Sequence, residues 1–488
     1  MAKFKDNSNE QGMFISVSFE EQIIPGTIEH AIYDIVENHI DTSKLEERYN
    51  NDETGQKAYS PKTLIKIILL SYSKGLFTSR RIEHACKTNI QFMAISGNGM
   101  PDHSTIAAFV SSIDEEVMDI FSSILLRCGE LDLIGGETFA IDGCKLSSNA
   151  SKEYSGTFKE LEKKKEKLKK VLQDMTKRHK ENDTLSDDDF KKRKKKYKDK
   201  IAKINTFLEE NEPKMGTRGK EIKSNITDNE SGKIKSGSGF IQGYNGLAVA
   251  DDKTQVIVSA EAFGTGQEGP QLETMIEQTD KNLKQAGIEN GLKEKKFLAD
   301  TNYFSEENCK VLEEKEIDGY IPDQHFRNRD PRFPDKYPRR KKKNLYSKED
   351  FNYNEKDNSF TCPAGKTLQY EGTVTNHGNK GRRYLAKHED CEKCHLKSKC
   401  LQKNSSRRSF SITDVPKPKT YSKKMKEKID TPNGRHMYSK RMGIVEPVFA
   451  NITVHKRLAE FTLRGKAKVN IQWLLYCCVH NIGKMVGV

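Results

Sequence analysis

Long apolar segments are missing from this 488-residue sequence, and only 34% of its residues are hydrophobic. No run approaches the roughly 18 apolar residues of a membrane-spanning helix. The apolar runs at residues 64–70 and 471–479 are short enough for core helices. The first residues include Lys3, Lys5 and Asp6 but no apolar stretch of the kind that marks a signal peptide. We therefore expect neither insertion into a membrane nor export.

The ten cysteines are not expected to form a disulfide framework, because no export signal is visible. Four of them stand in the order Cys362, Cys391-Glu392-Lys393-Cys394, Cys400, which fits a tetrahedral structural zinc site. The spacing to Cys400 is looser, so His395 is an alternative ligand, and unliganded thiols in a loop are the alternative to zinc. The others are expected to be small buried apolar side chains: Cys86, Cys128, Cys144, Cys309, Cys477 and Cys478.

Positive charge exceeds negative charge, with 84 Lys and Arg residues against 71 Asp and Glu residues, a net charge of +13. Such a balance favours a polyanionic partner, and binding to it should weaken steeply with salt. Lysine is also abundant in segments that look merely solvated, so a general lysine bias explains the charge as well. The basic segment at 327–343 is a candidate contact for such a partner, or a flexible solvated loop.

Three acidic residues, far apart in the sequence, stand in settings suited to holding a metal ion. Asp142 and Asp300 each follow a short apolar run, and Glu446 lies in Val445-Glu446-Pro447. A carboxylate just past a buried strand is held rigidly at the edge of a sheet. Hard divalent cations take oxygen ligands, and two of them can stabilise both oxygens of a phosphoryl displacement. The alternative is that each residue is an ordinary strand-end or helix residue.

The pattern of elements predicts an α/β architecture with insertions. Residues 1–130 read as helical, with Ser60-Pro61 as a helix start. Strands are expected at 137–148, 240–250 and 255–262, and a later strand ends at Asp300. Leucines at heptad-like spacing within 158–212 predict an antiparallel helical hairpin inserted between the first and second strands. Its lysines would follow phosphates or, as the alternative, form a solvated surface.

Five short segments, in this order along the chain, resemble the DDE transposases of bacterial insertion sequences. The segments are Gly243-Tyr244-Asn245-Gly246, residues 262–268, Ala299-Asp300-Thr301-Asn302-Tyr303, residues 445–449 and His480-Asn481-Ile482. The resemblance covers nearly the whole chain. It implies a helical DNA-binding domain at 1–130 and an RNase H-like catalytic domain at 131–488, a mixed sheet with helices. A helical hairpin at 156–214 and a basic, Cys-rich zinc-type insertion at 326–436 would interrupt that catalytic domain.

The resemblance also implies a metal-dependent active site. Asp142, Asp300 and Glu446 would be the catalytic triad holding two Mg²⁺ or Mn²⁺ ions, with Asp142 binding both. Carboxylates this close repel one another unless cations neutralise them. The same cysteine arrangement recurs in a subgroup of these transposases, so Cys362, Cys391, Cys394 and Cys400 are expected to bind Zn²⁺.

Several residues are expected to contact DNA. Many transposases of the resembled family carry a Tyr, an Arg, the catalytic Glu and a Lys in one signature, and Tyr438 and Arg441 match it in their relative spacing. The gap from Arg441 to Glu446 is one residue longer than in that signature, and the downstream Lys is displaced, with Lys456 or Arg457 the nearest candidates. The planar guanidinium of Arg441 suits bidentate phosphate binding.

Two further pairs are candidate DNA contacts. Asn302 and Tyr303 would orient DNA near the cut, with the Tyr ring stacking on an unpaired base, or they would cap the following helix. Arg80 and Arg81 would take part in recognising DNA ends. The alternative for these N-terminal helices is a packing module without base contacts.

The resemblance therefore implies a transposase that binds the terminal inverted repeats of an insertion sequence. It would act as a homodimer in a synaptic complex, cut double-stranded DNA and join 3′-hydroxyls to target DNA. It would work in the bacterial cytoplasm at the nucleoid, without a membrane. The alternatives are a metal-dependent nuclease of the same fold without strand transfer, and an inactive DNA-binding relic.

Overall fold

The computed structural model describes residues 16–49, 57–182, 186–216, 219–237, 239–332, 345–376, 379–402, 405–413 and 420–487. Lys3, Lys5, Asp6 and most of the basic segment at 327–343 lie outside these ranges. The chain forms two compact units, one of Met1–Asp323 with Thr431–Val488, the other of Gln324–Asp430. No helix among the described residues is long and apolar enough to cross a membrane.

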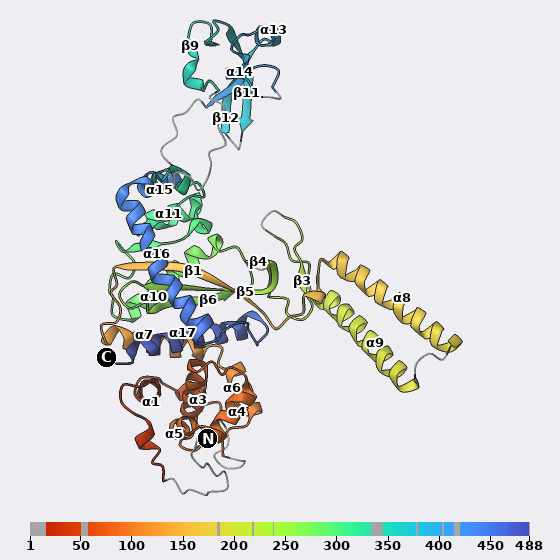
Figure 1. The fold of residues 1–488 in the computed structure, drawn as a ribbon, viewed down its shortest axis with the longest axis vertical. Helices are drawn as coiled ribbons and strands as arrows, with labels where there is room; N and C mark the ends of the chain where they lie inside the picture. Colours follow the sequence, from red (N-terminus) through yellow and green to blue (C-terminus); the bar gives the residue numbers. More distant parts are fainter. Residues whose placement is uncertain are drawn as a thin grey trace, which may run out of the picture. The chain divides into compact units, whose positions relative to one another are not determined.

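The first unit begins with a group of short helices (Figure 1). Some of these helices start with a side-chain cap. The side chain of Thr27 accepts a hydrogen bond from the N–H of His30, and the side chain of Asp102 accepts one from the N–H of Thr105. The helices are α1 (Ile28–Asn38), α2 (Ser43–Glu46), α3 (Pro61–Ser73), α4 (Ser79–Thr88), α5 (Ile90–Ser96), α6 (His103–Ser112) and α7 (Glu116–Glu130), after a 3₁₀ turn η1 (Glu20–Gln22).

These helices share a core with the C-terminal helix α17 (Lys466–Met485), which packs against α3 and α7. The rings of Tyr72 on α3 and Tyr476 on α17 have centroids 4.9 Å apart, and both side chains are buried. The N-terminal helices and the end of the chain are therefore built into one compact unit.

A mixed sheet forms the centre of this unit. The strand β1 (Thr138–Ser147) pairs antiparallel with β5 (Gly239–Asp251), which in turn pairs antiparallel with β4 (Gly232–Ser236) and β6 (Ile257–Phe263). On its other side β1 runs parallel to β7 (Lys296–Leu298), and β7 runs parallel to β8 (Asp318–Tyr320). The predicted α/β architecture is confirmed.

Helices cover this sheet. The helix α10 (Leu272–Gln285) packs on β6, α11 (Glu306–Glu314) on β8, α16 (Pro432–Ala450) on β1 and β5, and α17 on β6. The indole N–H of Trp473 on α17 donates to the carbonyl of Leu247 at 3.0 Å. A Cβ at the neighbouring Gly246 would lie 2.8 Å from the indole, so only glycine permits this close packing.

Helix α16 contains a proline that interrupts its hydrogen bonding. Pro447 has no N–H to donate to the carbonyl of Gly443, and the side-chain Nε2 of Gln255 donates to that carbonyl instead, at 3.3 Å. The helix continues into a π-helical turn, η6 (Asn451–His455). The regular part of α16 before Pro447 lies against β1 and carries Arg441.

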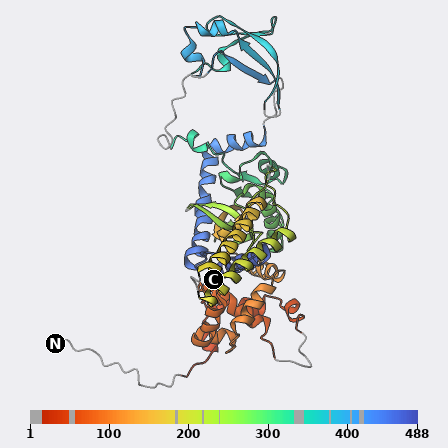
Figure 2. The ribbon, with the colours of Figure 1, turned by 90° about the vertical axis from the view of Figure 1, so that its right-hand side faces the viewer.

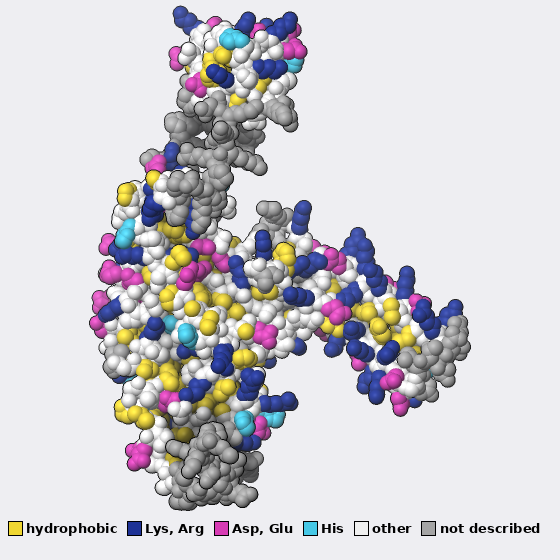
Figure 3. All heavy atoms as spheres, in the orientation of Figure 1, with side chains coloured by type: hydrophobic (Ala, Val, Ile, Leu, Met, Phe, Trp, Pro, Cys, Tyr) yellow, Lys and Arg dark blue, Asp and Glu magenta, His cyan; other side chains and the backbone are white. Residues whose placement is uncertain are grey.

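The predicted hairpin is formed by α8 (Phe158–Asn182) and α9 (Asp187–Glu210), which point toward the viewer in Figure 2. Its core contains Leu161, Ile204 and Phe207. Two short strands, β2 (Ser155–Gly156) and β3 (Ser224–Asn225), pair at its base. Lys and Arg side chains gather over both helices (Figure 3), so the hairpin presents a positively charged surface.

The second unit contains a five-stranded antiparallel sheet in the order β13-β12-β11-β10-β9. The strands are β9 (Asn352–Asn354), β10 (Ser359–Thr361), β11 (Thr367–Asn376), β12 (Asn379–Ala386) and β13 (Ser409–Thr413). The helices are α12 (Phe326–Arg329), α13 (His388–Glu392), α14 (Lys397–Cys400) and α15 (Tyr421–Asp430), with 3₁₀ turn η5 (Lys348–Asp350). The buried core of this sheet is small: Phe351, Phe360, Leu368, Tyr384 and Ala386.

Candidate active site

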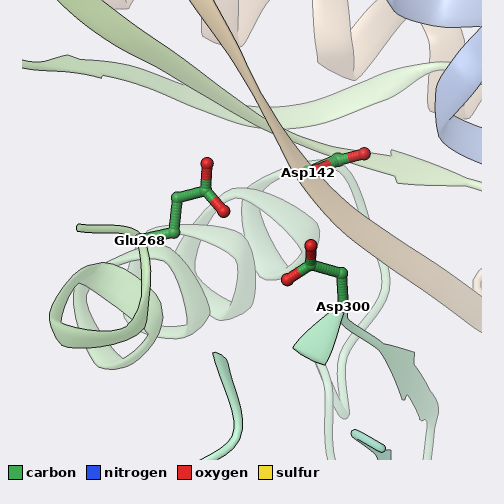
Figure 4. A group of neighbouring side chains, drawn as sticks. All are labelled: Asp142, Glu268 and Asp300. Carbon is green, nitrogen blue, oxygen red and sulfur yellow. The ribbon is translucent and has the colours of Figure 1, made fainter. Parts of the chain in front are cut away.

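Three carboxylates converge at the centre of the mixed sheet. Asp142 lies on β1, Asp300 follows β7, and Glu268 precedes the 3₁₀ turn η3 (Gly269–Gln271). One oxygen of each lies within 4.8 Å of an oxygen of the others (Figure 4). Because Ala140 pairs with Leu298 across parallel strands, the residues two positions further on, Asp142 and Asp300, reach the same level of the sheet.

Asn302 fixes two of these carboxylates relative to each other. Asp300 caps the 3₁₀ turn η4 (Thr301–Tyr303), and its Oδ1 accepts from the backbone N–H of Asn302 at 2.7 Å. The side-chain Nδ2 of Asn302 donates to Asp300 Oδ2 and to Glu268 Oε2, each at 3.1 Å. The predicted site residue Asn302 thus lies in the site, where it orients carboxylates.

Glu268 is held by two further donors although its side chain is only 3% exposed. Asn245 on β5 donates its Nδ2 to Glu268 Oε1 at 3.0 Å, and Lys145 Nζ lies 3.2 Å from the same oxygen. The Oδ1 of Asn245 is buried and has no hydrogen-bond partner among the described residues. A Cβ at Gly143 would lie 2.7 Å from that Oδ1, so this arrangement requires glycine next to Asp142.

Arg441 brings a second positive charge to the cluster. Its Nη1 donates to Asp142 Oδ2 at 2.8 Å, and the arginine side chain is 11% exposed. Burial alone would lower the pKa of Arg441, but the charge and hydrogen bond of Asp142 raise it above its usual value. Lys145 and Arg441 therefore offset part of the charge of the three carboxylates.

The environment of Asp300 disfavours its negative charge. Burial raises the pKa of Asp300, the backbone hydrogen bond from Asn302 acts in the opposite direction, and the charges of Glu268 and Asp142 raise it further. The net effect is a pKa above the usual value. A bound cation would reverse this balance, because it attracts the ionised form.

The structure does not bring Glu446 into the cluster, where Glu268 stands with the two aspartates. Arg441 reaches Asp142 from α16, whereas Glu446 is exposed on the same helix. Glu446 lies five positions after Arg441, which corresponds to about 140° around a helix axis. Glu268 ends the segment 262–268 that contributes to the family resemblance, but the resemblance did not assign a role to this residue. The signal was present, since Glu268 is an acidic residue shortly after the strand β6.

Other predicted DNA contacts lie in different environments. Tyr303 is 0% exposed, so its ring has no free face to stack on a base. Lys456 is only 8% exposed, and burial, with the charge of Lys484, lowers its pKa. Tyr438 is half-buried one turn before Arg441, while Arg80 and Arg81 are exposed on α4.

The four cysteines of the predicted zinc site lie together in the second unit. Cys362, Cys391, Cys394 and Cys400 line one cavity, whereas His395 is exposed and does not line it. Burial raises the pKa of the Cys400 thiol, Arg408 lowers it, and the other three thiols raise it further, which places all four within electrostatic reach.

The first cysteine lies in a tight turn. The N–H of Gly365 donates to the carbonyl of Cys362 at 2.8 Å, and the N–H of Lys366 lies 3.3 Å from its sulfur. Gly365 adopts a φ of +74°, which favours glycine. A turn that directs an amide toward a thiolate stabilises the ligand form of cysteine.

The mixed sheet with converging carboxylates is compatible with an RNase H-like fold, and comparison with protein families implies this fold and a DNA-cleaving enzyme. A transposase DDE domain matches residues 361–486, and the DUF772 transposase domain matches residues 17–112. No curated protein matches the chain. These two matches support a DDE transposase of the kind found in bacterial insertion sequences.

The two matches cover different parts of the protein. The N-terminal match includes α1 to α6, and the C-terminal match includes the four cysteines, Arg441 and Glu446. Neither match reaches Asp142, Glu268 or Asp300, so the geometry alone brings these three together.

Transposases of the DDE class use divalent metal ions, and the carboxylate cluster fits this requirement. Asp142, Glu268 and Asp300 offer hard oxygen atoms at close spacing, and Asn245 adds a buried amide oxygen without a partner. This is the donor type that Mg²⁺ and Mn²⁺ prefer.

Proposed function

We propose that this transposase binds the terminal inverted repeats of its own insertion sequence, cuts DNA at the element boundary and transfers the 3′-hydroxyl ends to target DNA. The convergence of Asp142, Glu268 and Asp300 on one point of the sheet carries this proposal. Two homodimer subunits, each holding one DNA end, would form the synaptic complex.

The three carboxylates would hold two divalent cations. Bound there, the cations supply charge stabilisation to the attacking and the leaving oxygen of phosphoryl transfer. Glu446, which the family resemblance implies as the third ligand, is the alternative to Glu268. Its exposed position on α16 favours Glu268 for this role.

Arg441 and Lys145 would exchange their carboxylate partners for phosphate groups of the DNA backbone. Each forms an ion pair with a carboxylate, Arg441 with Asp142 and Lys145 with Glu268. Cations on the carboxylates would compete with these ion pairs and free both side chains for phosphate. Lys145 also lines an open groove of about 620 Å³ together with Glu268 and Asn302, and a DNA strand in this groove would lie next to Glu268.

The cysteine unit would hold one structural zinc ion. Four thiols around one cavity match the ligand set of a closed zinc site, and such a site offers no open position for catalysis. Zinc would therefore stabilise the fold of the second unit.

The exposed arginines of α4 would contribute to binding of the DNA ends. We expect the double substitution Arg80→Ala with Arg81→Ala to weaken binding of end DNA. If both arginines contact phosphate, the slope of a plot of log association constant against log salt concentration should become less negative by about two. Fluorescence anisotropy over a salt series measures this. Lys293→Ala is a suitable control, because Lys293 is paired with Glu316 elsewhere on the surface. An unchanged salt slope would contradict the assignment.

The whole proposal is tested with DNA fragments that carry the element's own ends, Mg²⁺ or Mn²⁺ and the full chain. We expect nicks at the element boundary and joining of the released 3′ ends to a target plasmid. Cutting that ignores the ends would favour the metal-dependent nuclease. Binding without cutting under all metal conditions would favour an inactive relic.

A further inference from the structure

Tyr303 has a hydroxyl group that the fold leaves without a hydrogen bond. It is the last residue of η4, the turn capped by Asp300, and its backbone N–H donates to the carbonyl of Asp300 at 3.2 Å. The side chain is 0% exposed, and the hydroxyl has no partner among the residues that the structure describes. A buried hydroxyl without a partner is unfavourable, so this one calls for an explanation.

The surroundings of the hydroxyl are acidic. Burial, followed by the charges of Glu268, Asp142 and Asp300, raises the pKa of Tyr303 well above its usual value, and Arg441 acts weakly in the opposite direction. The hydroxyl therefore keeps its proton and is a buried hydrogen-bond donor in the turn that Asp300 caps, beside Asn302, which bridges Asp300 and Glu268.

None of the three carboxylates accepts a hydrogen bond from the Tyr303 hydroxyl. Asp142 accepts from Arg441, Glu268 from Asn245, and both Glu268 and Asp300 from Asn302. The hydroxyl is thus within electrostatic reach of three carboxylates and hydrogen-bonded to none of them. An additional oxygen atom between the ring and the cluster would satisfy it.

We propose that Tyr303 is a positioning residue of the cation site, whose hydroxyl donates a hydrogen bond to a water molecule in the inner shell of a hydrated divalent cation bound by Asp142, Glu268 and Asp300. This inference rests on the cation site of the proposed function. Outer-shell donors of this kind orient the ligands of a metal ion and tune its affinity.

The chain offers a matched control in Tyr476. Its hydroxyl is likewise buried without a partner in the described part of the chain, but it lies on α17 against Tyr72. Burial and the neighbouring Tyr72 raise the pKa of Tyr476, with no carboxylate among the causes. Tyr303→Phe and Tyr476→Phe therefore remove the same group in the same state of burial, beside the acidic cluster and away from it.

The test measures Mn²⁺ affinity by isothermal titration calorimetry and thermal unfolding in EDTA and in Mg²⁺. In EDTA both variants should unfold at or above the wild-type temperature, because each loses an unsatisfied buried group while the ring still fills its space. Tyr303→Phe should weaken Mn²⁺ binding by about tenfold and reduce the rise in melting temperature caused by Mg²⁺. Tyr476→Phe should leave both quantities unchanged.

The outcomes separate this inference from the function on which it rests. Wild-type Mn²⁺ affinity in Tyr303→Phe, together with cleavage at the element boundary, would overturn the role of Tyr303 alone. Equal weakening in both variants would also overturn it, because the effect would then not depend on the acidic cluster. A wild-type protein that binds no Mn²⁺ would overturn the inference and the cation site together.

Discussion

Asp142→Asn, Glu268→Gln and Asp300→Asn should each reduce cleavage at the element boundary by about a thousandfold or more. Each change removes one anionic ligand of a cation whose charge would lower the free energy of the transition state by several kcal/mol. A loss of about 4 kcal/mol of this stabilisation reduces the rate about a thousandfold. Gel analysis of end-labelled fragments in Mg²⁺ measures the effect. End-DNA binding in the absence of divalent cation should persist, since these side chains carry no positive charge with which to hold phosphate.

Glu446→Gln is the decisive comparison in this series. The side chain is exposed on α16 and lies outside the cluster, so we expect cleavage close to wild type. Loss of cleavage in Glu446→Gln with activity retained in Glu268→Gln would reverse the assignment of the third carboxylate. Cleavage that survives in all four variants would show that the catalytic carboxylates lie elsewhere.

Asp300→Asn should also have an effect on stability that is opposite in sign to its effect on activity. The folded state raises the pKa of Asp300, so this group contributes stability below its unfolded pKa and loses that contribution as the pH rises through the folded value. At neutral pH without divalent cation, the Asp300→Asn protein should therefore have a melting temperature at or above that of the wild type. The same variant should gain less from Mg²⁺ than wild type does.

Cys394→Ser is expected to abolish zinc binding and make residues 324–430 sensitive to proteases. Structural zinc contributes on the order of 10 kcal/mol to the folding of a small unit. The hydrophobic core of this unit contains few buried residues, and three of the cysteines pack directly against it. Zinc content by elemental analysis and limited proteolysis followed by mass spectrometry measure the two effects.

His395→Ala is the matched control, because His395 is next to Cys394 in sequence but exposed and outside the cavity. It should retain zinc and resist proteolysis. Loss of zinc in His395→Ala with retention in Cys400→Ser would make the histidine the fourth ligand. A wild-type protein that is free of zinc and resistant to proteases would contradict the zinc site.

Local sequence signals predicted the elements of this protein well. Capping and proline rules place the start of α3 after Ser60, and β1 runs within the predicted 137–148. The heptad spacing of 158–212 corresponds to α8 and α9. Such features depend on interactions between residues a few positions apart, which the sequence states directly.

The positions of Asp142 and Asp300 at the sheet were also accessible from the sequence. Each follows a short apolar run that forms a strand, and carboxylates after neighbouring parallel strands meet at one level. The resemblance to a family named Glu446 as their partner. It could not say which side of α16 that residue faces, because the rotation of a helix depends on the packing of Met437, Ile444 and Val448.

The sequence by itself therefore determined the class of protein, the succession of helices and strands, the zinc-type cysteine order and two of the converging carboxylates. Only the tertiary structure decided that Glu268 joins Asp142 and Asp300, that Tyr303 is buried beside them, and that Glu446 faces solvent. These facts arise from strand register, helix rotation and the path of the loop after β6. Contacts between residues far apart in the sequence hold this arrangement together, such as those of Arg441 with Asp142 and of Lys145 with Glu268.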